Sequence, residues 1–383
     1  MKRVAFLYNH DAPHQVAHLA GTMSALASDP GVEVTALVAR PAAEAVARRL
    51  SGPSEARIQW QHIEMHPVAA RFAPLLDRLF PFSRLMTLRA NMDLFARYDA
   101  IVSSERTCLR IKHQLGARSP QMIYVPHGSG DRNVAHHPAL RDFDLHLVSG
   151  QKLVDVGLEF GIIRPDNWRI TGYSKFDGVD LDARPKLFAN DNPVILYNPH
   201  FDPHLSSVYA QGEDVLDLFA RRPDFNLIFA PHVMYGRKRW HFSLEFKTLN
   251  RRWDVPERLE SLPNILIDLG SQKSIDMTYT RAADVYLGDV SSQVYEFLAR
   301  PRATIFLKSH DVAWRDHPDY QFWHNGPVID HVRDLEPLLD RWQAVAADYR
   351  ATQQRLFAYT VDMTAEPASV RGARAIADYV GAL

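Results

Sequence analysis

Short apolar runs alternate along the chain with longer segments whose apolar residues recur at helical spacing. In the first half, the runs predict strands at 4–8, 32–38, 100–103, 122–125, 145–149 and 168–171, and the helical spacing predicts helices at 14–27, 42–50 and 151–159. Strands that alternate with helices are typical of an α/β fold with a parallel sheet. Ligands of such sheets bind beyond the carboxyl ends of the strands, so the polar residues there are the candidate site residues.

A polar segment at 177–192, which contains Pro185, Asn190 and Asn192, interrupts this alternation and predicts an interdomain linker. The alternation then restarts, with strands expected at 194–197, 226–230, 265–267, 285–288 and 303–307 and helices at 214–221, 274–281, 292–299, 335–358 and 370–383. The sequence therefore predicts two Rossmann-like domains, 1–178 and 193–365. We expect a last helix, within 366–383, to cross back to the first domain.

Composition narrows the function classes. The net charge is -1 and we find no basic stripe, so the sequence does not favour nucleic-acid binding. The single cysteine, Cys108, excludes an intrachain disulfide and a cysteine-rich zinc site, and we interpret it as a small buried thiol. Because no apolar run reaches the roughly 18 residues of a membrane span, we expect a cytoplasmic protein.

Two of the predicted strands run into histidine-containing turns. Residues 122–132, MIYVPHGSGDR, place His127, Gly128 and Ser129 after the strand at 122–125, where the imidazole is either a general base or a turn cap. The strand at 194–197 ends at Tyr197 and runs into a segment with three further polar residues, His200, Asp202 and His204. These could ligate a divalent metal, but we favour a loop over the mouth of a cleft.

Two further strands carry the same kind of signal. Pro231 and His232 follow the strand at 226–230, where the imidazole is either a phosphate donor or a buried structural residue. The strand at 285–288 runs into Asp289, Ser291 and Ser292 at the start of a predicted helix. A helix N-terminus offers free N–H groups to phosphate, and Glu296 lies one turn further on, where it could reach a ribose. A plain serine cap is the alternative, but it accounts for only one of the two serines.

The stretch 71–98 mixes arginines with phenylalanines and leucines. Such a stretch either lies on an anionic membrane surface or forms an ordinary amphipathic pair of core helices.

These segments resemble the CDP-glycerol glycerophosphotransferase family of teichoic-acid and capsule enzymes, whose fold is of the GT-B type. The resemblance covers roughly residues 120–310. It rests on a His-Gly-Thr-like motif at 127–129, a Tyr-x-Pro segment at 197–199, a Pro-His turn at 231–232, an Asp-x-Ser-Ser segment at 289–292 and a Gly-x-x-Lys-x-Asp junction at 172–177. The chain departs from the family pattern at Ser129, which stands for threonine, and in lacking the Trp-Arg pair after Tyr-x-Pro.

The resemblance implies a transferase, peripheral to the inner face of the cell membrane, with its active site in a cleft between the two domains. It implies that His127 and His232 are catalytic: His127 would act as base on a glycan or lipid-linked acceptor, and His232 would neutralise the pyrophosphate of a CDP-activated donor. Glycerol phosphate, or a related polyol phosphate, would be transferred and CMP released. The donor-binding residues would be Pro231, Gly128, Ser129, Asp289, Ser291, Ser292, Glu296, Tyr197 and His200. No cofactor is obligatory, no metal is implied, and a divalent cation is not indicated.

Three other readings stay open at the sequence level. A GT-B glycosyltransferase would use a nucleotide sugar and release a nucleoside diphosphate, and a UDP-sugar 2-epimerase would need no acceptor. A non-enzymatic accessory protein of an export complex would bind a nucleotide without turnover.

Overall fold

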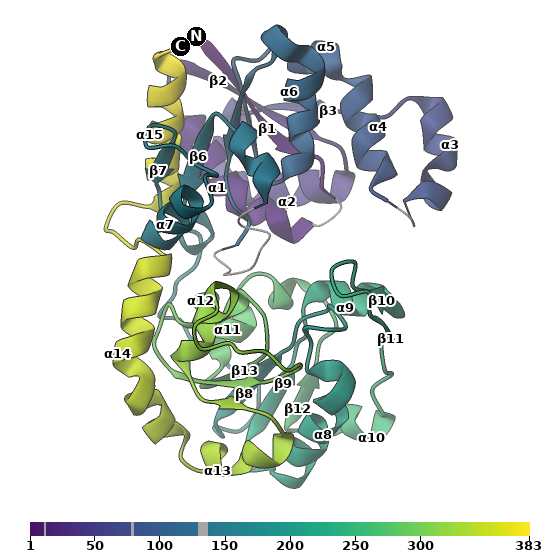
Figure 1. Cartoon of the computed structure of the whole chain (residues 1–383), viewed down its shortest axis with the longest axis vertical. Coiled ribbons are helices and arrows are strands. Elements are labelled where there is room, and N and C mark those ends of the chain that lie inside the picture. Colours follow the sequence, from purple (N-terminus) through teal and green to yellow (C-terminus); the bar gives the residue numbers. More distant parts are fainter. Residues whose placement is uncertain (11–12, 78–79, 129–136) are drawn as a thin grey trace. The chain divides into compact units, whose positions relative to one another are not determined.

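The computed structural model describes residues 1–10, 13–77, 80–128 and 137–383. Its contacts divide the chain into two compact units. Unit 1 holds the described residues up to Val179 together with Ala358–Leu383, and unit 2 holds Asp180–Phe357 (Figure 1).

Unit 1 is built on a parallel sheet of seven described strands in the order β3-β2-β1-β4-β5-β6-β7. The strands are β1 (Lys2–Tyr8), β2 (Val32–Val38), β3 (Gln59–His62), β4 (Ala100–Ser103), β5 (Gln121–Tyr124), β6 (Leu145–Val148) and β7 (Trp168–Ile170). The helices are α1 (Ala17–Leu26), α2 (Pro41–Ser51), α3 (Pro67–Leu76), α4 (Phe82–Ala90), α5 (Met92–Phe95), α6 (Leu109–Leu115), α7 (Gln151–Glu159) and α15 (Ala368–Gly381).

Both faces of this sheet are covered at its inner strands, which is why those strands are largely apolar runs. Along β1, Val4 and Phe6 point into one core cluster with α1, α2 and α15, and Ala5 and Leu7 point into the other. The C-terminal helix α15 packs along α1. The Asp177 carboxylate accepts hydrogen bonds from the first two backbone N–H groups of α15 at 3.1 and 2.6 Å, so the start of this helix is capped from the end of the first half of the chain.

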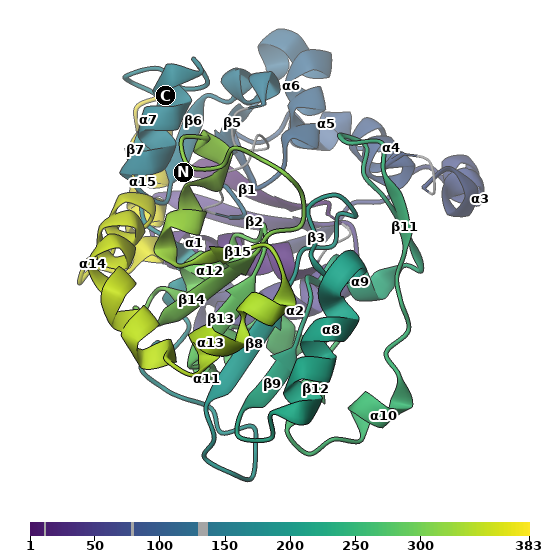
Figure 2. The same cartoon turned by 60° about the horizontal axis from the view of Figure 1, so that its bottom comes forward.

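Unit 2 repeats this plan. Its parallel sheet has the order β12-β9-β8-β13-β14-β15 (Figure 2). The strands are β8 (Val194–Asn198), β9 (Asn226–Phe229), β12 (Ile265–Ile267), β13 (Val285–Gly288), β14 (Ala303–Leu307) and β15 (Val328–Ile329), and β10 (Trp240–Phe242) and β11 (Leu249–Arg251) form a separate antiparallel hairpin. The helices are α8 (Val208–Arg221), α9 (Val233–Arg237), α10 (Glu257–Glu260), α11 (Thr278–Ala282), α12 (Gln293–Phe297), α13 (Glu336–Leu339) and α14 (Trp342–Thr360).

Counted within each unit, both sheets follow the Rossmann order 3-2-1-4-5-6, with a seventh strand in unit 1. The predicted fold class, an α/β fold with two Rossmann-like parallel sheets, is therefore confirmed. Helix α14 is anchored to unit 2 by Gln353, whose Nε2 donates to the carbonyl oxygens of Arg302 and Asn325, both at 2.8 Å.

The stretch 71–98 forms the end of α3 together with α4 and α5. Helix α3 exposes Val68, Phe72 and Leu75, whereas α4 buries Thr87 and Leu88. Within the described ranges, no helix is long and apolar enough to cross a bilayer.

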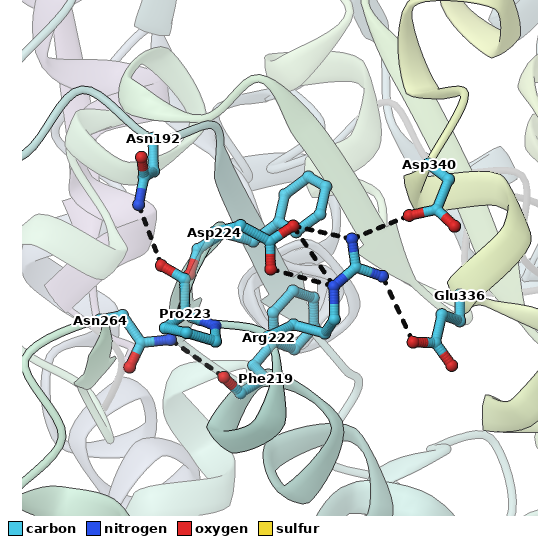
Figure 3. Close-up of polar contacts among 9 residues, drawn as sticks. Asn192, Phe219, Arg222, Pro223, Asp224, Asn264, Glu336 and Asp340 are labelled. Carbon is cyan, nitrogen blue, oxygen red and sulfur yellow. Dashed lines mark hydrogen bonds and ion pairs between the residues drawn. The ribbon is translucent and has the colours of Figure 1, made fainter.

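Polar side chains form hydrogen bonds and ion pairs at the amino-terminal edge of the sheet of unit 2 (Figure 3). Asn264 is buried and its Nδ2 donates to the carbonyl oxygens of Phe219, in the last turn of α8, and Phe225, at 2.9 and 3.1 Å. Arg222 follows α8 and forms ion pairs with Asp224 and Asp340 at 2.8 Å and with Glu336 at 3.3 Å. The side chains thus bond groups that a helix end leaves without an intrahelical partner.

We expect Asn264→Ala to destabilise unit 2 by about 1–3 kcal/mol, because the carbonyls of Phe219 and Phe225 each lose a buried amide donor, while Phe219 keeps the backbone N–H of Arg222 at 3.2 Å. Urea unfolding measures this change. Asn192→Ala is the matched control, since the half-buried Asn192 donates to one carbonyl, that of Pro223 at 2.9 Å, and we expect less than about 0.5 kcal/mol. Equal losses in the two variants would contradict the assignment.

His146 makes the stability of unit 1 depend on pH. Burial lowers the pKa of this β6 side chain to about 4, and its Nε2 has no hydrogen-bond partner among the described residues. Because the folded state keeps the imidazole neutral while the unfolded chain protonates it, the stability present above pH 6.5 should fall by up to about 3 kcal/mol as the pH drops to 4. In His146→Phe, unfolding measured across this range should lose that part of the slope; an unchanged slope would contradict the prediction.

Candidate functional site

The strand order of unit 2 reverses between β8 and β13, and this switch point is where open α/β sheets bind ligands. Asn198 and His200 end or follow β8, Pro231 and His232 follow β9, and Asp289 and Ser291 follow β13. The structure therefore brings three of the predicted segments together at one edge of one sheet.

Asp289 holds the loops of this edge in place. Its side chain is 1% exposed, and its Oδ1 accepts from the backbone N–H groups of His200 (2.8 Å) and Val290 (2.6 Å). Its Oδ2 accepts from the N–H and the hydroxyl of Ser207 at 2.7 and 2.9 Å. Burial raises the pKa of Asp289 to about 6 against the opposite effect of these donors, so the group is an ionised acceptor at neutral pH. All this bonding is internal, and Asp289 shapes the site.

Asn198 plays a second connecting role that the sequence did not reveal. Its Nδ2 donates to the carbonyl oxygen of Ala230 at 2.6 Å, and its Oδ1 accepts from Tyr286 and from the Ser291 hydroxyl, both at 3.2 Å. One buried amide thus joins the ends of β8, β9 and β13. In the sequence, this role is signalled only by an asparagine at the end of a predicted strand, next to Pro199.

The histidines after β8 and β9 share one geometry. The N–H of Asp202 donates to Nδ1 of His200 at 3.0 Å, and the N–H of Met234 donates to Nδ1 of His232 at 3.3 Å. An Nδ1 that accepts a hydrogen bond leaves the proton on Nε2, so both rings carry Nε2–H donors. The ring centroids lie 5.7 Å apart, and Phe201 lies against both rings.

Capping of α9 is enough to explain the hydrogen bond that Nδ1 of His232 accepts from Met234. His66, His137 and His317 also accept from the N–H two residues on, each at the start of a helix. What distinguishes His200 and His232 is their position at the switch point and the nearness of their rings. A pair of Nε2–H donors this close suits a diphosphate.

The other predicted donor-binding residues of unit 2 divide into exposed and buried groups. Ser292 is exposed and is the N-cap of α12, which is only five residues long. Ser291 is buried, and its hydroxyl donates to Oδ1 of Asn198. Glu296 and Pro231 are buried.

Tyr197 requires a correction. Its side chain is fully buried in the core, stacks on Phe229 and shares a 2.8 Å hydrogen bond with the Ser207 hydroxyl. Because its ring and hydroxyl are both used inside unit 2, we assign Tyr197 no donor contact.

His200, Asp202 and His204 do not form a metal-binding group. The Asp202 Oδ1 accepts from the N–H of His204 at 2.9 Å, and the His204 ring stacks on Phe246 at 4.0 Å. Throughout the described part of the chain, no cluster of three or more His, Cys, Asp or Glu side chains is arranged to hold a metal ion.

In unit 1, His127 has the opposite tautomer. Its Nδ1 lies 3.0 Å from the carbonyl oxygen of Ser104, which can only accept, so Nδ1 carries the proton and Nε2 the lone pair. Burial lowers the pKa of His127 below its ordinary value of 6.5, although the Ser104 bond opposes this. The imidazole is therefore neutral at pH 7 and can accept a proton at Nε2.

A pocket lies at the carboxyl ends of β5, β6 and β7 in unit 1. Gly128 is among its lining residues, together with His18, Thr22, Ser149, Thr171 and Ser174. The Ser149 and Ser174 hydroxyls of this lining donate to the carbonyl oxygens of Thr360 and His18, at 2.9 and 2.8 Å, so they are used inside unit 1. Ser129, predicted to bind the donor, lies outside the described residues.

The switch point of unit 1, between β1 and β4, holds residues that sequence reasoning missed. Arg84 pairs with the buried Glu105 after β4 at 2.9 Å, and Asn9 after β1 donates to the Arg84 carbonyl at 3.1 Å. Cys108 is buried there, and burial raises the pKa of its thiol far above the ordinary value, so it is not a nucleophilic thiolate.

We expect Asp289→Asn to destabilise unit 2 by about 2 kcal/mol, because the amide nitrogen would face an N–H donor that now meets a carboxylate oxygen. Chemical unfolding measures this. Ser292→Ala is the control: the hydroxyl is exposed and makes no capping bond in the described structure, so the change should stay within about 0.5 kcal/mol. A stable Asp289→Asn protein would remove the loop-holding role.

No family model and no curated protein sequence matches the chain. Among solved structures, it is similar to a Listeria monocytogenes protein assigned as a UDP-N-acetylglucosamine 2-epimerase (TM-score 0.65, 13% identity, 100% of this chain and 97% of that one). It is also similar to the glycotransferase of kitacinnamycin (TM-score 0.62, 13% identity, 99% of both chains). A third similar structure is the wall teichoic acid polymerase TagF soaked with CDPG (TM-score 0.56, 13% identity, 100% of this chain and 88% of that one).

At these identities the likeness establishes the fold and not the reaction. The similar structures are epimerases and transferases built on paired Rossmann-like domains. The chain therefore has a fold of the GT-B type.

Proposed function

We propose that the chain is a transferase that moves glycerol phosphate, or a related polyol phosphate, from a CDP-activated donor to a hydroxyl of a glycan or lipid-linked acceptor, releasing CMP. The proposal rests on the opposite tautomers of the histidines that follow the strands of the two sheets. His200 and His232 present Nε2–H donors in unit 2, and His127 presents an Nε2 lone pair in unit 1. Phosphoryl transfer needs both kinds of group, a proton acceptor and donors to phosphate oxygens.

In this proposal the Nε2 atom of His127 takes the proton of the acceptor hydroxyl as its oxygen attacks the β-phosphorus. The new P–O bond forms while the bond from the β-phosphorus to the bridging oxygen breaks, and CMP leaves with that oxygen. His200 and His232 donate to the pyrophosphate oxygens, where negative charge develops on the leaving group. Exposed Ser292 adds a hydroxyl donor at the same edge.

The similarity to TagF supports this reaction, because it covers the whole chain and that structure was soaked with CDPG. A nucleotide-sugar enzyme is the second candidate. It is favoured by the similarity to the UDP-N-acetylglucosamine 2-epimerase structure and to the S. aureus MnaA–UDP co-structure. The nucleotide base and the released product distinguish the two candidates.

Calorimetric titration with CDP-glycerol, CDP, UDP-N-acetylglucosamine and UDP tests the donor. We expect the cytidine nucleotides to bind preferentially and His232→Ala to weaken them by about 10–100-fold, as befits a lost hydrogen bond to charged phosphate. His317→Ala is the matched control, because it removes an equivalent histidine cap elsewhere in unit 2. Binding of uridine nucleotides alone would overturn the CDP-donor proposal in favour of the second candidate.

His127→Ala should lower the rate of CMP release from CDP-glycerol by about 10²–10⁴-fold in the presence of an acceptor, with donor affinity nearly unchanged. Because burial lowers the pKa of His127, the native rate should fall on acidification at a lower pH than it would with an ordinary histidine as the base. His137→Ala, a cap removal in the same unit, is the control. Full activity of His127→Ala would exclude it as the base.

A further inference from the structure

The β10–β11 hairpin of unit 2 carries an exposed apolar face. Phe242 pairs with Leu249 across the two strands, and Trp240 pairs with Arg251. Residues that pair directly across an antiparallel ladder point to the same face. The apolar members of this surface are strongly exposed: Trp240 58%, Phe242 56%, Leu249 58% and, just beyond β10, Leu244 86%.

The opposite face of the hairpin attaches it to α9. His241 is buried, its ring stacks on Tyr235 at 5.6 Å and its Nε2 lies 3.1 Å from the carbonyl oxygen of Met234. Arg252, next to β11, donates to the carbonyl oxygen of Gly236 at 2.9 Å. These bonds fix which face looks outward, so the apolar side chains are presented to solvent by the fold of unit 2.

The hairpin is also strongly basic. The segment Arg237–Asp254 has six cations against two carboxylates, a net charge of +4, in a chain whose net charge is -1. One of those carboxylates, Asp254, is shared by Arg239, Arg251 and Arg252 at 3.1, 3.3 and 3.6 Å. A single carboxylate cannot neutralise three guanidinium groups, so the rim of the apolar face stays positive.

We propose that this hairpin docks unit 2 onto an anionic lipid surface. Tryptophan, phenylalanine and leucine enter the boundary between headgroups and acyl chains, and the surrounding lysines and arginines bind lipid phosphates. A second copy of the chain fits this surface poorly, because a symmetric contact would bring two net positive rims together. Nucleic acid fits it less well than lipid, because Leu244 and Leu249 add exposed apolar area that base stacking on Trp240 and Phe242 would not cover.

Co-sedimentation with vesicles tests the charges. With phosphatidylcholine vesicles containing about one third phosphatidylglycerol, Lys238→Glu/Lys247→Glu should bind at least about 30-fold more weakly than the native chain, at roughly fivefold for each lysine lost near such a surface. Arg333→Glu/Arg341→Glu changes the net charge equally at exposed positions elsewhere in unit 2 and should bind within about threefold of the native chain. Equal weakening in both pairs would show a non-specific charge effect and overturn the proposal.

Fluorescence quenching tests whether the apolar face of the hairpin enters the lipid. Brominated lipid should quench part of the tryptophan fluorescence of the bound native chain, and Trp240→Phe should lose that part while it keeps its vesicle affinity. Trp240→Ser/Leu244→Ser should bind about tenfold more weakly, and its unfolding midpoint should be unchanged because both side chains are exposed.

Three results would overturn the docking proposal. One is the absence of vesicle binding by the native chain at low salt. Another is a dimer in sedimentation that Trp240→Ser/Leu244→Ser dissolves, which would assign the face to a second copy. The third is a native chain that binds single-stranded nucleic acid but not vesicles, with the nucleic-acid binding lost in Lys238→Glu/Lys247→Glu.

Discussion

A buried carboxylate at the end of β13 is the constraint on which the carboxyl-terminal edge of the sheet of unit 2 depends. Asp289 accepts four hydrogen bonds, three from backbone N–H groups, and its own carbonyl oxygen accepts from the Trp323 indole at 2.6 Å. Those bonds hold the loop after β8 against the loop after β13 at the point where the strand order reverses. The backbone of His200 is one of the donors, so the position of that imidazole follows from a residue 89 positions further along the chain.

The parallel sheets were predictable from the sequence because their strands are buried on both faces. The predicted bounds of 32–38, 100–103 and 285–288 are those observed for β2, β4 and β13. The edge strand β3 was missed for a physical reason: it is Gln-Trp-Gln-His and largely exposed, so it lacks the apolar run that marks its neighbours. The β10–β11 hairpin was missed because it reverses the usual pattern, with His241 inside and Trp240 and Phe242 outside.

The candidate site was predictable as a set of segments but not as a set of roles. Spacing placed His127, His200 and His232 after strands, and the structure puts each of them there. What distinguishes a ring with a lone pair on Nε2 from a ring with a proton there is the partner of Nδ1: a carbonyl oxygen for His127 and backbone N–H groups for the other two. Such partners depend on how loops fold back, which hydrophobic periodicity does not encode. The same limit explains Tyr197, whose motif pointed to the donor while its ring fills the core.

The basic β10–β11 hairpin and His232 are both attached to helix α9. Docking of the hairpin, as proposed, would therefore also affect the position of this histidine. His232 caps α9, and α9 is the helix whose Tyr235, Met234 and Gly236 hold the hairpin. Helix α9 is only five residues long, so a lipid surface that immobilises the hairpin would also restrict α9 and the imidazole at its start. For an acceptor carried by a lipid, a donor site fixed at a defined height above the membrane would reduce the orientational freedom that transfer has to overcome.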